Sequence, residues 1–530
     1  RINDVRVLRN HQFSEDAGPM AHPVRPASYQ EINNFYTLTV YEKGAEVVRM
    51  QANLLGEQDF RRATDLYFDR FDGQAVTIED FADCMAEISG LDLAQFMNWY
   101  RQAGTPRLDV SDRYDEDKQR YELTVSQSCA ASPGQADKEP FLVPLRIGLI
   151  GRDGPLAFTE QDSGPEAEKV LKVSEKKQTF IFEQVAQRPI PSLLRGFSAP
   201  VRIEFAYTDE QLAKLARVDV DGFNRWDAIQ QLAERTIEQG AWHDSNSTDL
   251  LVETCRQVIE DRDLEPALAA VMLQLPTVDS IFDNQQQPDL DSIYLARKRL
   301  RQALATNLGE QLQQRYQSLA SDEPYQPTPE QIGQRSLKNT LLAMWNQGDS
   351  DAAFEAAQQQ YKQAGNMTDR YAALSVLVNS GHSRAETVAA EALNRLYRDW
   401  KDENLVINQW LSLQASAERP GGLARVQELM QHPAFSMSNP NKVRSLIGAF
   451  CGLNPFNFHN PDGAGYQFLA DRVLELDRLN PQTASRMVNP LSRWRHFDTE
   501  RSAKMQQALQ AMSEQDLSRD LREIVDKSLA

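Results

Sequence analysis

Residues 33–50 read NNFYTLTVYEKGAEVVRM, and this stretch carries the clearest local pattern in the chain. Apolar residues and a glycine recur over Val40–Leu55 at the i, i+4, i+7 spacing of an amphipathic helix, and the glycine would allow close packing. Gly56 follows as a residue that ends helices. The residues alone leave open whether Tyr36 and Tyr41 are ordinary side chains of a hydrophobic core or side chains with a chemical role.

Residues 1–104, which surround this stretch, are expected to be largely helical after an irregular opening. Glycine and proline at positions 18, 19, 23 and 26 interrupt regular structure in that opening. Helix-start and helix-stop signals follow further along the chain. They predict helices over Asp59–Phe71, from Thr77 (capped together with Asp80) to Gly90, and from the pair Asp92 and Gln95 through Phe96, Trp99 and Tyr100.

Residues 105–207 predict a small β-sandwich. Short segments of alternating polarity are separated by turn-rich stretches such as Ser132-Pro133-Gly134. Several short strands within about 100 residues are typical of a two-sheet sandwich. The expected strands include Tyr121–Val125, Phe141–Leu149, Thr179–Phe182 and Val201–Tyr207.

Residues 208–530 predict a large helical domain. Strand signals vanish there, and Ala, Leu, Gln and Glu dominate in runs of helical length. Serial helical hairpins over this length most naturally form a curved α-solenoid with a concave face. The runs include Phe223–Gln239, Thr248–Asp261, Leu290–Leu319 and Thr387–Gln414. The predicted fold is therefore multidomain and mainly α, with one β-sandwich between two helical blocks.

Composition limits the possible partners and compartments. The 530 residues carry a net charge of −19, which would repel a phosphate backbone, so nucleic acid is not an expected partner. No stretch approaches the ~18 consecutive apolar residues of a membrane span. No targeting signal is visible, and a start at Arg1 instead of Met suggests that residue 1 is not the natural start.

Four widely separated cysteines predict free thiols in a reducing compartment, here the cytoplasm: Cys84, Cys129, Cys255 and Cys451.

The residues by themselves contain no complete catalytic set. None of the seven histidines belongs to an H-E-x-x-H or H-x-x-E-H motif, and no G-x-S-x-G or Walker sequence occurs. His11 and Glu15 are four residues apart, as two metal ligands on one helix could be. Their region is expected to be irregular, however, and a third ligand is not evident.

Tyr41-Glu42-Lys43-Gly44-Ala45, followed by an apolar helix, resembles the Y-E-K-G-A motif of the aminopeptidase N family. These zinc metallopeptidases (gluzincins) remove N-terminal residues from peptides. The resemblance covers the whole chain, because the bacterial branch has the same order of catalytic helices, β-sandwich and superhelical C-terminal domain. Residues 438–450 and 480–486 are similar to that C-terminal domain in particular.

The resemblance also implies that part of such an enzyme is not in this sequence. The family's zinc ligands come from H-E-x-x-H and a second Glu, and its G-A-M-E-N motif lies before them; none of these motifs is present. Residues 1–104 would then be the closing helices of a thermolysin-like catalytic domain, whose N-terminal half is the missing partner. We expect the chain alone to hold no zinc, to be inactive, and to expose apolar surface on residues 1–104.

The resemblance assigns roles to five residues. Tyr41 would donate a hydrogen bond to the oxyanion of the tetrahedral intermediate, because a phenol stays protonated at neutral pH. Tyr36 would line the pocket for the substrate side chain. Arg444, Gln482 and Arg486 would face a channel that admits short peptides. For the two arginines, a solvated or salt-bridged helix face remains an open alternative.

A second function class is a helical-repeat scaffold without catalysis that binds peptides or protein partners. The intact motif around Tyr41 favours the peptidase, because a scaffold has no use for an oxyanion donor at a helix start. The missing half of the catalytic domain leaves both hypotheses open.

Overall fold

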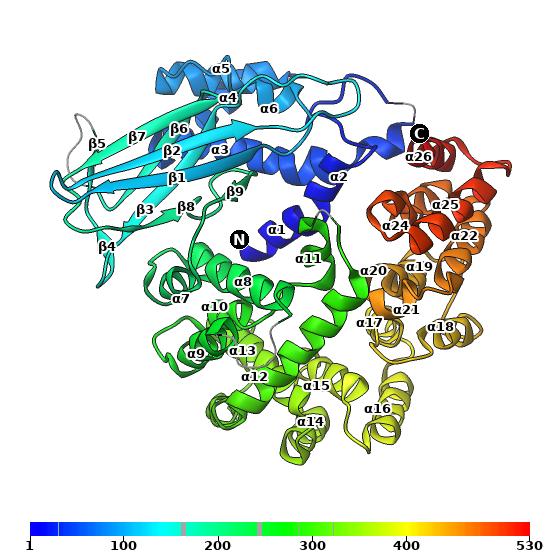
Figure 1. The fold of residues 1–530 in the computed structure, drawn as a ribbon. Helices are drawn as coiled ribbons and strands as arrows, with labels where there is room; N and C mark the ends of the chain where they lie inside the picture. Colours follow the sequence, from blue (N-terminus) through cyan, green and yellow to red (C-terminus); the bar gives the residue numbers. More distant parts are fainter. Residues whose placement is uncertain (30, 161–165, 241–245, 286, 322) are drawn as a thin grey trace. The chain divides into compact units, whose positions relative to one another are not determined.

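The computed structural model describes residues 1–29, 31–160, 166–240, 246–285, 287–321 and 323–530 (Figure 1). The described chain forms two compact units, Arg1–Ile229 and Gln230–Ala530. Helix α8 (Gly222–Glu238) contains the boundary between them. The first unit holds the N-terminal helices and all the described strands, and the second is helical.

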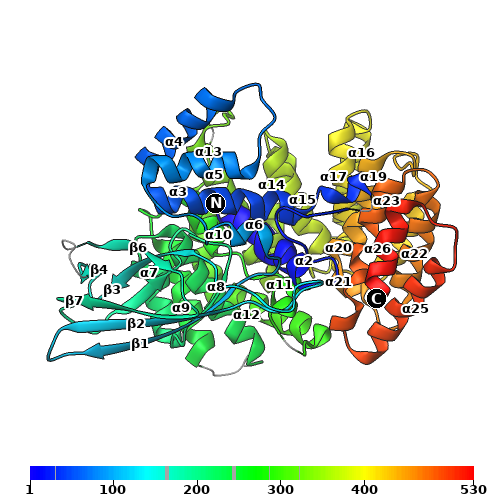
Figure 2. The same ribbon diagram turned by 90° about the horizontal axis from the view of Figure 1, so that it is seen from above.

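Most helices of the first unit precede its strands in sequence. Thr77 and Asp80 form the predicted capping box, in which each residue's side chain accepts a hydrogen bond from the other's backbone N–H, at 3.3 and 2.7 Å. Gly90 ends that helix with a φ of 67°. Helices α3, α4 and α5 lie next to one another (Figure 2). The helical elements are α1 (Ile2–Val7), η1 (Leu8–Gln12), α2 (Phe13–Ala17), η2 (Ile32–Phe35), η3 (Thr39–Lys43), α3 (Gly44–Leu55), α4 (Glu57–Phe71), α5 (Ile78–Ser89), α6 (Asn98–Arg101) and α7 (Asp209–Val218).

The prediction of an irregular opening is wrong for residues 2–17. These residues run through α1, η1 and α2 without a break, and the glycine–proline interruption takes effect only at Gly18. Val5, Leu8 and Phe13 are at most 3% exposed, so the stretch buries an apolar face. That face, rather than the nearby prolines, determines the local structure.

The described strands form a five-stranded sheet and a four-stranded sheet. One has the order β5-β7-β2-β1-β9, and the other has the order β4-β3-β6 with β8 also paired to β3. In β2, Tyr121, Leu123 and Val125 point to the core and are fully buried, as the alternation predicted. The strands are β1 (Arg107–Asp115), β2 (Arg120–Ser128), β3 (Val143–Ile150), β4 (Pro155–Leu156), β5 (Thr159–Glu160), β6 (Glu168–Val173), β7 (Lys177–Glu183), β8 (Ile190–Leu193) and β9 (Arg202–Glu204).

Of the predicted cap pair, Asp92 binds a nearby backbone N–H as expected, but Gln95 does not act as a cap. The Asp92 carboxylate accepts from the Ala94 N–H, but the Gln95 amide donates to backbone carbonyls of the β-domain, those of Pro140 and Ser174. The neighbouring Trp99 packs its ring 4.6 Å from that of Phe141 and donates its indole N–H to Leu142. These side chains join the N-terminal helices to the β-domain, so tertiary contacts override the local cap.

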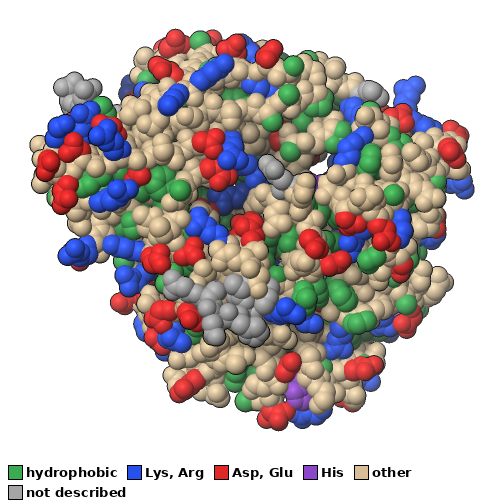
Figure 3. All heavy atoms as spheres, in the orientation of Figure 1, with side chains coloured by type: hydrophobic (Ala, Val, Ile, Leu, Met, Phe, Trp, Pro, Cys, Tyr) green, Lys and Arg blue, Asp and Glu red, His purple; other side chains and the backbone are tan. Residues whose placement is uncertain are grey.

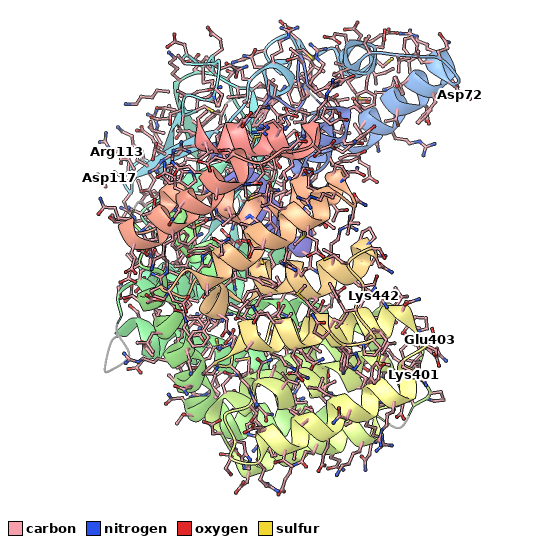
Figure 4. The ribbon with its side chains drawn as sticks, turned by 90° about the vertical axis from the view of Figure 1, so that its right-hand side faces the viewer. Asp72, Arg113, Asp117, Lys401, Glu403 and Lys442 are labelled. Carbon is pink, nitrogen blue, oxygen red and sulfur yellow. The ribbon has the colours of Figure 1, made fainter. Side chains whose placement is uncertain are left out.

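The second unit is a succession of paired helices. Residues 387–414, predicted as one helical run, are interrupted at residues 401–403, where Figure 4 labels Lys401 and Glu403. The helices are α9 (Asn246–Glu260), α10 (Pro266–Met272), α11 (Val278–Asn284), α12 (Leu290–Ser318), α13 (Pro329–Trp345), η4 (Asn346–Gly348), α14 (Asp351–Gln363), α15 (Met367–Asn379), α16 (Ala385–Trp400), α17 (Asn404–Ala415), α18 (Gly422–Met430), α19 (Pro440–Val443), η5 (Arg444–Gly448), α20 (Ala449–Leu453), α21 (Pro455–Phe458), α22 (Ala464–Asp477), α23 (Pro481–Met487), α24 (Asn489–Ser492), η6 (Trp494–His496), α25 (Thr499–Ser513) and α26 (Arg519–Leu529).

Helix α12 links the beginning of this unit to its end. Asp291 on α12 pairs with Arg501 on α25 at 2.8 Å, and Tyr294 stacks on Phe456 with ring centroids 5.0 Å apart. About two turns beyond Tyr294, Arg301 pairs with Glu418 at 2.6 Å. The solenoid is therefore tied across its repeats by one 29-residue helix.

The remaining features concern the charge on the surface and the apolar content of the helices. Figure 3 shows acidic and basic side chains interspersed on the face it presents. None of the described helices has both the length and the apolar content that crossing a bilayer requires.

Candidate active site around Tyr41

Tyr41 lies in the middle of η3, a single π-helical turn that leads into α3. Its side chain is 58% exposed, and its hydroxyl makes no hydrogen bond within the described part of the chain. Isolated π turns inside helices frequently occur at functional sites. The phenol is therefore held on an ordered turn and is free to donate a hydrogen bond to a ligand.

Tyr36 lies directly beside Tyr41. The two rings are stacked with centroids 6.2 Å apart and an interplanar angle of 29°. Phe35 meets the Tyr36 ring edge-on at 6.0 Å, and Tyr29 meets Phe35 in the same way. Tyr36 is 51% exposed, so the reading of both tyrosines as buried core residues is wrong. The exposed apolar surface expected on residues 1–104 includes these rings, and also Ile32, Val48, Phe68 and Val76.

The first residue of the π turn is fixed by Glu15. One carboxylate oxygen of Glu15 accepts hydrogen bonds from both the backbone N–H and the hydroxyl of Thr39, at 2.9 and 2.6 Å. The amide of Gln12 donates to the same hydroxyl at 3.2 Å. Thr39 is fully buried. Both of its polar groups are thus satisfied by the helix formed by η1 and α2.

The last residue of the π turn is fixed by a buried ion pair. The Lys43 ammonium lies 2.7 Å from Asp16 and also donates to the Gly104 carbonyl at 2.9 Å, and both charged side chains are at most 1% exposed. Asp16 further accepts from the Gly104 N–H and the Thr105 hydroxyl, each at 2.9 Å. Burial acts to raise the pKa of Asp16, but Lys43 and these hydrogen bonds outweigh it and lower the pKa below its usual value.

His22 supports the segment that enters the π turn. Its Nε2 lies 3.0 Å from the hydroxyl of Thr37, and its Nδ1 lies 2.8 Å from the Pro23 carbonyl. The Thr37 hydroxyl in turn accepts from the Val40 N–H at 3.2 Å. Gly44 follows the turn, and a Cβ there would lie 3.6 Å from Val24, an ordinary contact. Close packing within the described chain therefore does not require a glycine at position 44.

The described residues do not provide a zinc site. His11 and Glu15 lie one turn apart on continuous helix, but Glu15 already binds Thr39 and no third ligand joins them. More generally, no three His, Cys, Asp or Glu side chains of the described residues come together as metal ligands, and His243 lies outside those residues. The metal implied by the resemblance thus has no fitting donor set here.

The three remaining candidate residues lie in the second unit. Gln482 and Arg486 are one helical turn apart on α23, and both are exposed. Arg444 is exposed at the start of η5, where its guanidinium donates to Asn441 at 3.4 Å. A Cβ on Gly448 of η5 would lie 3.6 Å from Met487 of α23, so the two elements are neighbours. Neither arginine forms an ion pair with any described residue.

Sequence reasoning missed the residues that hold the π turn. Glu15, Asp16 and His22 lie in the stretch expected to be irregular, so no helical periodicity pointed to them. Thr39 and Lys43 belong to the motif, but nothing in its spacing predicts that both become buried. The only signal in the sequence was that two acidic residues, Glu15 and Asp16, are adjacent.

Family models match almost the entire chain. The Peptidase family M1 domain matches residues 4–100. A domain of unknown function with an Ig-like fold, DUF3458, matches residues 104–206. A domain of unknown function made of ARM repeats, DUF3458_C, matches residues 209–530. The three matches follow the order of helices, strands and solenoid described above.

Curated relatives and a solved structure agree with these models. Aminopeptidase N of Escherichia coli is 41% identical over 100% of this chain and 61% of its own length. Aminopeptidase N of Caulobacter vibrioides is 37% identical, again over the whole chain and 60% of the relative. The crystal structure of Legionella pneumophila aminopeptidase A in complex with aspartic acid superposes with a TM-score of 0.86 at 30% identity, over 96% of this chain and 58% of that one.

This chain thus spans about three fifths of the length of the curated relatives that it matches. Its similarity to the bacterial enzymes extends through the N-terminal helices, the Ig-like domain and the ARM repeats. The chain therefore belongs to the family of bacterial M1 aminopeptidases of the aminopeptidase N type.

Proposed function

We propose that this chain is part of a zinc aminopeptidase that removes N-terminal residues from peptides, and that Tyr41 is its oxyanion donor. One observation carries the proposal: the Y-E-K-G-A tyrosine is presented on a π turn, exposed and without a hydrogen-bond partner in the described chain. A hydroxyl held in this way can donate to negative charge that develops on a carbonyl oxygen, without first breaking another bond.

The proposed reaction needs the Tyr41 donor of this chain and a metal site that the residues of this chain do not provide. In enzymes of this class, a metal ion polarises the carbonyl and supplies a nucleophilic water. The described residues offer that ion no site, so no step of the mechanism runs through it here. This chain contributes the Tyr41 donor, and the stacked Tyr36 ring beside it offers an apolar wall for the first side chain of the peptide.

We further propose that Arg444, Gln482 and Arg486 contact the peptide beyond its first residue. The two arginines are exposed and form no ion pair with described residues, so their charge is available to a carboxylate. The unpaired state of all four cysteines fits a cytoplasmic location, where thiols stay reduced.

The isolated chain is expected to bind no stoichiometric zinc and to hydrolyse no aminoacyl-amide substrate. Neither the sequence nor the described structure provides the ligands. Elemental analysis of the purified chain and a chromogenic aminopeptidase assay check this expectation. A tightly held zinc ion in each chain, or measurable hydrolysis that a chelator abolishes, would contradict it.

Replacement of Arg444 or Arg486 by alanine is expected to weaken the binding of tripeptides more than the hydrolysis of a single-residue chromogenic substrate. Under the proposal these side chains contact the peptide beyond its first residue, so their loss affects only substrates that have such residues. The measurement compares KM for the two substrates, in the chain joined to the segment that its relatives carry in addition. Equal losses on both substrates would indicate a structural role for the arginine instead.

A further inference from the structure

Two adjacent residues of α2 hold the two ends of the π turn that presents Tyr41. Glu15 binds Thr39, the first residue of the turn, and Asp16 binds Lys43, the last. Tyr41, between them, has no side-chain hydrogen bond of its own to a described residue. The position of its hydroxyl therefore depends on how firmly these two ends are fixed.

Glu15 and Asp16 differ in the hydrogen bonds that they accept from residues outside the π turn. Asp16 also binds Gly104 and Thr105, at the start of the β-domain, so its loss would disturb the fold well beyond the turn. Among the described residues, the Glu15 carboxylate accepts hydrogen bonds only from Thr39, and it forms no ion pair with any of them. Its effect on the turn can therefore be separated from an effect on folding.

The two hydrogen bonds from Thr39 converge on a single oxygen of Glu15. The bond from the hydroxyl is short, at 2.6 Å, and the bond from the backbone N–H has an ordinary length of 2.9 Å. Thr39 is fully buried, so water cannot replace this acceptor if it is removed. Without Glu15, the Thr39 N–H would lose its carboxylate acceptor. The Thr39 hydroxyl would keep the 3.2 Å hydrogen bond from Gln12, and the Thr39 carbonyl would still accept from the Gly44 N–H.

We propose that Glu15 is a positioning residue, which fixes Thr39 and thereby holds the Tyr41 hydroxyl where the oxyanion forms. This inference rests on the proposed function, because it gives Glu15 a role only through Tyr41. It makes two separable claims. Glu15 sets the order of the π turn in the chain itself, and that order determines how well Tyr41 serves the reaction.

The first claim is testable on the isolated chain by amide hydrogen exchange. Glu15→Ala is expected to speed the exchange of the Thr39 amide by about tenfold or more, because a charged acceptor is lost. Glu15→Gln keeps an oxygen acceptor and should leave that exchange rate close to that of the parent chain. Glu87→Ala, which removes an exposed carboxylate bound to Arg70 on the α4–α5 hairpin, is the matched control and should change nothing at Thr39. Unchanged exchange in Glu15→Ala would overturn the proposal.

The second claim requires the chain joined to the additional segment of its relatives, with zinc bound. There, Glu15→Ala should lower kcat by about tenfold with little change in KM, and Glu15→Gln should restore most of the loss. In a Tyr41→Phe background, Glu15→Ala should have no further effect, because the residue acts only through the absent hydroxyl.

The outcomes distinguish this inference from the proposed function. If Tyr41→Phe leaves kcat unchanged, the proposed role of Tyr41 is wrong. If Tyr41→Phe lowers kcat while Glu15→Ala does not, the role of Tyr41 stands and the inference about Glu15 is wrong. If Glu15→Ala lowers kcat by the same factor with and without the Tyr41 hydroxyl, Glu15 acts by another route, and the inference is again wrong.

Discussion

Replacement of Tyr41 by phenylalanine is expected to lower kcat by about 10²–10³-fold, the usual cost of removing one oxyanion donor. The test uses the chain joined to the additional segment of its relatives. The substitution removes one hydroxyl and almost no volume. That hydroxyl has no hydrogen bond in the described structure and its ring is more than half exposed, so folding should be unaffected. KM should change little, because the ground-state carbonyl carries less charge than the intermediate.

Tyr36→Phe is the matched control for this experiment. Its ring would still stack on Tyr41, and its hydroxyl likewise has no described partner. The change should alter mainly KM or the preference for the first side chain of the peptide. If Tyr36→Phe abolished activity while Tyr41→Phe kept kcat within about threefold of the parent enzyme, the two tyrosines would have been assigned the wrong way round.

Replacement of Lys43 by methionine is expected to destabilise the isolated chain by about 3–5 kcal/mol, because it leaves the buried Asp16 carboxylate without its cation. Both side chains of the pair are at most 1% exposed, so water cannot take the place of the ammonium. Urea unfolding of the first unit, followed by its tryptophan fluorescence, measures the loss. Arg61→Met, which breaks an exposed pair with Asp65, is the control and should leave the midpoint unchanged.

The same pair makes a prediction about acid. The pKa of Asp16 is lowered on folding, so its ionised form contributes stability that is fully present above the ordinary pKa of about 3.9. That contribution is lost as the pH falls through the lower, folded-state pKa. Asp16→Asn should therefore flatten the acid limb of the stability curve. An unchanged acid limb in this variant, or a Lys43→Met chain as stable as the parent, would contradict the account of the pair.

The helical and β regions could be predicted from the sequence wherever local patterns carry the information. The alternation in Tyr121–Val125 and the Thr77–Asp80 box both predicted what the structure has. Local patterns were misleading where distant contacts decide. Gln95 resembles a cap residue but donates to backbone carbonyls of the β-domain that lie 45 and 79 residues away. Residues 2–17 resemble a broken opening, but they form continuous helix because their apolar face is buried.

The candidate site shows the same limit more sharply. The motif alone singled out Tyr41, because its residue types and order are specific. The side chains that hold it could not be inferred, since Glu15 and Thr39 are 24 residues apart and Asp16 and Lys43 are 27 apart. No spacing rule joins a carboxylate on one helix to a threonine on a later π turn. Only the fold brings them together.

The long helix α12 has a consequence for how the solenoid assembles and comes apart. In an open array each repeat touches only its neighbours, so the ends fray and unfolding proceeds stepwise. Here the ion pairs of α12 reach 117 and 210 positions along the chain, to Glu418 and Arg501. The last helices therefore cannot fray without breaking a contact with α12. Such an array should unfold more cooperatively than an open one. It should also fold late, since the contacts of α12 with the most distant helices form only after those helices have formed.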